Sequence, residues 1–278
     1  MRSLQRAILV VFANSQDLGF EQTIKAALAQ TPALDWPDYA AQGATLRDYP
    51  DYPQNPHGPW LRLDNAAAMA RAMAAELVRL GLPSAVIQAN RDQFERELNA
   101  QQGVYARLAQ DHRLRETTLL LMIPGLCDLV ANLDVHGVAV LMAEGSGTVS
   151  GQRLSEAVTK LKSGEYGGIV CPLSMVHSKQ GEAARQVAAD SGAPIAYVRF
   201  QDTDLAQDTY LSVSAYNAAA LAGLSAPRAA IQATCAPSRL WLWLTVLIII
   251  ALLVGLKLGR GMGKRLCPHH GAGIFDQK

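Results

Sequence analysis

Short runs of consecutive apolar residues alternate along the chain with segments in which apolar residues recur at helical spacing. The first pattern is typical of strands buried on both faces, and the second of helices with one buried face. Strands are expected at residues 7–13, 84–88, 117–123, 137–142, 168–171 and 194–200. Helices are expected at residues 20–29, 65–80, 92–111, 153–161, 181–191 and 212–224. The alternation predicts an α/β fold with a largely parallel sheet.

The pattern starts again near residue 116, after a polar helical segment, and this restart predicts two related halves. We expect two Rossmann-like parallel-sheet halves, over residues 1–115 and 116–224, followed by a linker at residues 225–238. Residues 31–63 are rich in proline, aspartate, tyrosine and glycine, and are expected to form a long irregular connection within the first half.

A different apolar segment lies near the C-terminus, where residues 240–256 contain no charged side chain. As a helix this segment would span about 25 Å, which is at the short end of the length needed to cross a bilayer. Tryptophans stand at one end and lysine and arginine side chains follow the other, as at the two interfaces of a membrane span. The pattern predicts one C-terminal transmembrane helix at residues 239–258 and a basic tail at residues 259–278.

Composition adds limits on function and location. The 278 residues carry a net charge of +1, which argues against a nucleic-acid partner. The total divides into +5 over residues 239–278 and −4 over the remainder. The basic tail favours a cytoplasmic C-terminus, which would place the body on the other side of the membrane. The lack of an evident signal peptide favours instead a cytoplasmic body, and this is the orientation that we expect. Four cysteines without a CxxC pair exclude a zinc knuckle.

Polar residues and glycines follow several of the expected strands, at the edge of a parallel sheet where ligands bind. Glu144 and His177 follow two of these strands and could ligate a divalent metal or act as a catalytic acid and base. The ordinary alternatives are an acid at a helix N-terminus for Glu144 and a polar loop residue for His177. Further candidate binding residues in these turns are Asn14, Ser15, Gly125, Gly145, Ser146 and Ser174.

The order of these motifs resembles the class II tetrapyrrole chelatases, especially the anaerobic cobalt chelatases that act on sirohydrochlorin. The resemblance rests on AILVVFANS, GLPSAVIQ, TLLLMIPG and VAVLMAEG, and on the stretch at residues 154–178. It implies that Glu144 and His177 bind cobalt, nickel or iron and accept pyrrole protons during metal insertion. Pro124 stands where the family has its first metal-binding histidine. The resemblance therefore implies a metal or tetrapyrrole ligand, with turnover left open.

Two alternatives to this interpretation remain from the sequence. Residues 63–100 are also similar to the first helix, strand and second helix of caspase-like proteins, with both catalytic positions lost. The third hypothesis is a membrane-tethered scaffold that docks a protein partner. All three interpretations include the lipid bilayer as a partner.

Overall fold

The computed structural model describes residues 7–28, 30–142, 149–200 and 209–225. Over these residues the chain has an α/β fold with two parallel sheets, as the alternation of patterns predicts. In this described part, none of the helices combines the length and the apolar composition needed to cross a bilayer. The segment expected to span a membrane, residues 239–258, lies outside the described residues.

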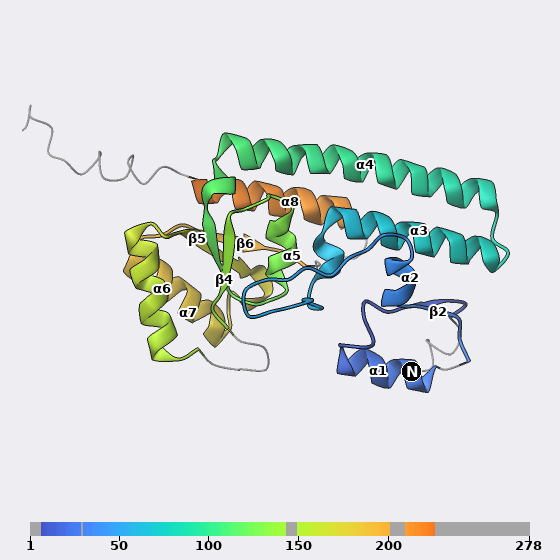
Figure 1. Cartoon of the computed structure of the whole chain (residues 1–278), viewed down its shortest axis with the longest axis horizontal. Coiled ribbons are helices and arrows are strands. Elements are labelled where there is room, and N and C mark those ends of the chain that lie inside the picture. The colour runs from blue at the N-terminus through green and yellow to red at the C-terminus, as the bar shows by residue number, and fades with distance from the viewer. Residues whose placement is uncertain (1–6, 29, 143–148, 201–208, 226–278) are drawn as a thin grey trace, which may run out of the picture. The chain divides into compact units, whose positions relative to one another are not determined.

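The N-terminal region contains a small parallel sheet (Figure 1). Strand β1 (Val10–Val11) pairs with β2 (Ala33–Leu34), and helix α1 (Gly19–Ala27) lies between them in sequence. The predicted first strand is therefore shorter than its apolar run, and Val11 is exposed instead of being covered on both faces. Helix α2 (Trp36–Ala40) follows, and its first turn is closed by a capping box.

Two long helices connect this region to the second sheet. Helix α3 (Leu63–Arg79) packs against α4 (Ser84–Asp111), and the two lie side by side (Figure 1). The prediction of a strand at residues 84–88 is wrong, because these residues form the first turns of α4. Val86 is exposed on this helix, and the polar residues that follow continue the helix without a break. Tertiary packing against α3 outweighs the weak strand preference of this short apolar run.

The second sheet has four parallel strands in the order β4-β3-β5-β6. They are β3 (Thr118–Leu121), β4 (Gly137–Val140), β5 (Tyr166–Pro172) and β6 (Ile195–Val198), each within or overlapping a predicted strand. Short helix α5 (Leu126–Ala131) connects β3 to β4, and longer helices α6 (Gly151–Ser163), α7 (Lys179–Ser191) and α8 (Tyr210–Ala222) follow. Short 3₁₀ turns lie at Pro59–Leu61, Leu114–Glu116, Leu173–Met175 and Gly223–Ser225.

The main core lies around this sheet. The three leucines of β3 and the centre of β5 are buried, as predicted for strands covered on both faces. Helix α8 packs on β6 and on α4, and Tyr105 of α4 donates a hydrogen bond to the Ser214 carbonyl at 3.0 Å. The long helix α4 therefore belongs to the same core as the sheet.

Candidate functional site

The carboxyl ends of the four parallel strands meet at one edge of the sheet, which is where ligands bind in folds of this type. The turn after β3 is Ile123-Pro124-Gly125, and the turn after β5 runs from Leu173 to Ser178. After β4 and β6 the described residues end at Met142 and Phe200. The candidate site is therefore built on this edge.

Residues 44–62, which we call the docking segment, reach this edge from the N-terminal region. Three buried asparagines fix the segment through backbone groups. The side-chain amide of Asn65 on α3 accepts a hydrogen bond from the backbone N–H of Thr45 at 3.0 Å. It also donates to the backbone carbonyls of Thr45 and Pro59, each at 3.0 Å. Asn132 donates to the Leu61 carbonyl at 2.9 Å, and Asn55 donates to the Pro124 carbonyl at 3.0 Å. An asparagine suits this task because its amide both donates and accepts.

His57 lies on the docking segment directly over the turn after β3. A methyl group added at Gly125 would come 2.7 Å from the His57 carbonyl oxygen, and one added at Gly58 would come 2.3 Å from the Gly125 oxygen. The two backbones therefore touch at glycine positions, where no other residue fits without a shift. This packing places the half-buried His57 at the carboxyl edge of the sheet.

A second contact between the docking segment and the sheet region involves a buried carboxyl. Tyr49 donates a hydrogen bond to Oδ1 of Asp128 on α5 at 3.0 Å, and Oδ2 has no hydrogen-bond partner among the described residues. Burial raises the pKa of Asp128 to about 6, against the opposing effects of the Tyr49 hydrogen bond and of Arg62 and Arg47. Burial and the Asp128 charge also raise the pKa of Tyr49 above its usual range. The contact therefore contains a carboxyl group that titrates close to neutral pH.

The predicted site residues fall into three groups. Gly125 and His177 both follow strands of the four-stranded sheet at its carboxyl edge, Gly125 buried and His177 exposed. Ser174 is exposed in the same turn as His177. Glu144 lies outside the described residues, as do its neighbours Gly145 and Ser146.

Asn14 and Ser15 belong to the other sheet, and the side-chain bonds that hold them are internal to the N-terminal region. The Asn14 side chain donates to Asp17 at 2.8 Å, and its backbone N–H donates to the Glu21 carboxylate at 2.9 Å. Ser15 bonds the Asp35 carboxylate through its backbone and its hydroxyl. These bonds close the turn after β1, which accounts for the polar residues there without a ligand.

Local sequence patterns do not single out His57, which lies in the run Asn-Pro-His-Gly-Pro inside the connection expected to be irregular. The available signal was a histidine between two helix-breaking residues, just before a long amphipathic helix. The proline and glycine on either side of His57 restrict the backbone there. His177, by contrast, was a candidate because it follows a predicted strand, and it is exposed. The sequence gives no sign that the segment docks on the turn after β3.

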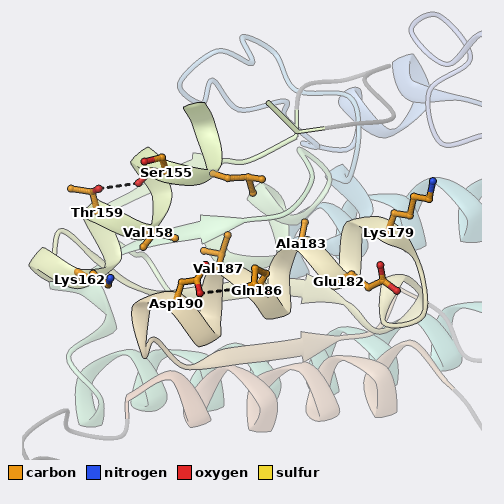
Figure 2. A pocket seen from close by; sticks show the side chains of 11 residues that line it. Ser155, Val158, Thr159, Lys162, Lys179, Glu182, Ala183, Gln186, Val187 and Asp190 are labelled. Carbon is orange, nitrogen blue, oxygen red and sulfur yellow. Dashed lines mark hydrogen bonds between the residues drawn. The ribbon is translucent and has the colours of Figure 1, made fainter. Parts of the chain in front are cut away.

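Two cavities lie away from this edge. A groove of about 750 Å³ runs between α6 and α7, with Lys162 and Asp190 at one end and Lys179 and Glu182 at the other (Figure 2). A cavity of about 480 Å³ at the starts of β3, β4 and β5 is lined partly by Cys127. Burial raises the pKa of the Cys127 thiol to about 12, so in the metal-free protein the thiol stays protonated at neutral pH. Neither cavity contains a predicted site residue.

No three side chains of the types His, Cys, Asp and Glu lie close enough together within the described ranges to hold a metal ion. Two described histidines lie at the carboxyl edge of the sheet: His57, whose backbone contacts the turn after β3, and His177, in the turn after β5. His136 lies at the amino edge.

The fold of the chain is that of known metal-binding proteins. A structure of ZnuA matches with a TM-score of 0.61 and 22% identity, covering 80% of this chain and 81% of that chain. A zinc-bound ZnuA deletion mutant matches with a TM-score of 0.63 and 23% identity, covering 81% and 82%. The Zn(II)-bound AdcAII variant of Streptococcus pneumoniae matches with a TM-score of 0.61 and 17% identity, covering 81% and 82%.

The family follows from the sequence match. The model of the ZnuA family, described as "Zinc-uptake complex component A periplasmic", matches residues 1–223. The chain belongs to the ZnuA family. None of the curated proteins compared with this chain matches it.

These findings correct the interpretation of the sequence. The likeness to chelatases is wrong, as are the caspase-like and scaffold alternatives, because the family match places the chain in the ZnuA family and its fold is that of ZnuA structures. The expected cytoplasmic location of the body is also wrong, since the family is described as periplasmic. The transmembrane helix expected at residues 239–258 lies outside the described residues and stays a prediction. The tetrapyrrole ligand and the bilayer partner have no support. The expected divalent metal is consistent with the family description, which names zinc uptake, and structural neighbours are titled as zinc-, manganese- and cadmium-bound.

Proposed function

We propose that this chain is the substrate-binding component of a divalent-metal uptake system and that its cargo is zinc. The family match over residues 1–223 carries the proposal, and the fold shared with zinc-bound proteins supports it. Its partner would be the membrane-embedded permease of an ABC-type uptake complex, to which it delivers the metal.

The carboxyl edge of the four-stranded sheet is the proposed place of binding. His57 supplies an imidazole there from the docking segment, and His177 is a second candidate on the turn after β5. Neutral imidazole nitrogens and carboxylate oxygens are ligands that zinc accepts readily. The described residues do not complete a metal site, so we include Glu144, which follows β4 in sequence, as a further ligand.

We also retain the division into two α/β halves near residue 115, with the docking segment as the link that bridges them. The separate parallel sheets on either side of this boundary support the division. A metal site at the carboxyl edge would then take ligands from both halves: His57 from the first, and Glu144 and His177 from the second.

The test is a zinc titration of the purified, metal-free full chain against a chromophoric competing chelator. We expect one tight site in the wild-type chain. In His57→Ala the loss of affinity should exceed the roughly 10- to 100-fold typical of changes outside the ligand sphere. His136→Ala is the matched control, because this exposed histidine lies at the opposite edge of the same sheet.

Glu144→Ala and His177→Ala test the two ligands proposed from the sequence by the same titration. Repeating it with Mn²⁺, Co²⁺, Ni²⁺ and Fe²⁺ measures the metal preference. Absence of zinc binding by the wild-type chain at micromolar concentrations would refute the proposed function. Equal zinc affinities in His57→Ala and His136→Ala would refute the assignment of His57 as a ligand and leave the proposed function standing.

A further inference from the structure

Asn55 is the residue that connects His57 to the sheet. Its side chain is completely buried. The amide nitrogen donates to the Pro124 carbonyl at 3.0 Å, and the amide oxygen accepts from the backbone N–H of His57 at 3.2 Å. Its own backbone N–H donates to the Arg47 carbonyl at 3.0 Å. One side chain thus joins the proposed ligand to the end of β3.

The surrounding backbone leaves little freedom for this connection to shift. Gly58 and Gly125 are in contact at positions that already exclude a Cβ atom, so the docking segment cannot approach β3 more closely. The Asn55 amide prevents the segment from moving away, because separation would leave the buried Pro124 carbonyl and the buried Asn55 amide N–H without partners. The glycine contact and the amide therefore set the position of His57 from opposite directions.

We propose that Asn55 is a positioning residue for metal binding, which holds His57 over the turn after β3 in the geometry needed by the metal. This inference rests on the proposed function, since it takes His57 as a metal ligand. Asn55 itself does not touch the metal. It acts by fixing the main chain of the ligand before the metal arrives, so its loss lowers affinity through a less ordered His57.

Asn65 provides a matched control. It is an equally buried asparagine that also fixes the docking segment, through the Thr45 and Pro59 backbones, but it bonds neither His57 nor Pro124. Asn55→Ala and Asn65→Ala should therefore destabilise the same segment in similar ways. Only the first variant should change the metal site.

The experiment compares the full-length wild-type chain with both variants, by zinc competition and by the visible absorbance of the Co²⁺-loaded protein. We expect Asn55→Ala to bind zinc roughly 10-fold more weakly, with altered cobalt bands. Asn65→Ala should keep the wild-type affinity and spectrum even where its melting temperature falls. Equal effects of the two variants would show a merely structural role and overturn the inference.

Asn55→Asp is the second variant, and it covers the case in which the alanine variant does not fold. An aspartate keeps the oxygen that accepts the His57 N–H and loses the donor to Pro124. Because the inference assigns the link between His57 and the sheet to this donor, Asn55→Asp should also bind zinc more weakly than the wild type and change the cobalt bands, and wild-type affinity with wild-type bands would contradict the inference. Failure of the wild-type chain to bind zinc overturns the proposed function and this inference together, whereas normal wild-type binding with unchanged Asn55 variants overturns this inference alone.

Discussion

Removing the charge of Asp128 should stabilise the protein at neutral pH. Asp128 is 1% exposed, and burial raises its pKa from the ordinary 3.8 to about 6. Its folded-state pKa lies above its unfolded-state value, so the folded state binds the proton more tightly. The contribution of Asp128 to stability is therefore greatest below about pH 4 and is lost as the pH rises through the folded-state pKa. A shift of this size corresponds to about 3 kcal/mol between the two ends of the range.

The variant that tests this reasoning is Asp128→Asn, which keeps an oxygen to accept the Tyr49 hydroxyl. We expect the free energy of unfolding of the variant, relative to the wild type, to rise by up to about 3 kcal/mol between pH 4 and pH 8. Urea unfolding at several pH values measures it, and the comparison between pH values cancels losses that do not depend on pH. A difference that stays constant across this range would refute the argument.

Asp134→Asn is the matched control for this measurement. Asp134 lies between α5 and β4, its side chain is 81% exposed, and its positive φ of 54° is a conformation that asparagine also accepts. Its replacement should not reproduce the pH effect of Asp128→Asn, because that effect comes from burial of the side chain and the Asp134 side chain is exposed. A matching pH effect in the control would indicate a change of net charge instead of desolvation at Asp128.

Two further predictions concern the stability of the protein. Tyr49→Phe removes the hydroxyl that donates to Asp128, so the pKa of Asp128 should rise further. The fall in stability should then extend to higher pH in urea unfolding, and an unchanged pH profile would contradict this prediction. Gly181→Ala should destabilise the protein by about 1–3 kcal/mol, since an added Cβ would lie 2.0 Å from a backbone oxygen of the preceding turn. Thermal unfolding tests this change, with Gly151→Ala as control because its Cβ would meet open space.

The sequence predicts the four-stranded sheet well because each of its strands is bounded by clear signals. β3 is a continuous apolar run that ends at Pro124-Gly125, and β5 ends at Pro172. The same rule failed at residues 84–88, where a short apolar run continues into a long polar helix and packs against α3. Periodicity over five residues does not distinguish a strand from a helical turn, so tertiary contacts decide between them.

The mistaken family resemblance has a related cause. A polar residue or glycine after each strand, in regular alternation with helices, is common to parallel α/β folds with quite different functions. The resemblance rests on the order of these strand ends, and residues 44–62 do not contribute to it because they have no periodic pattern. Pro124, which stands where the chelatases have a histidine, has a role of its own, because its backbone carbonyl is the acceptor for Asn55.

The candidate site depends on contacts between residues that are far apart in the sequence, and this is why local patterns did not reveal it. Asn55 and Pro124 are separated by 69 positions, as are Leu63 and Asn132, and Tyr49 and Asp128 by 79. Each bond satisfies a group that would otherwise be buried without a partner, so the sequence specifies these pairs only through the finished fold. An asparagine before a histidine in an irregular segment therefore has meaning only once the acceptor across the sheet edge is known. The separate variants at Asn55, Asn65 and Asp128 divide this network into the part that holds the ligand and the parts that hold the segment.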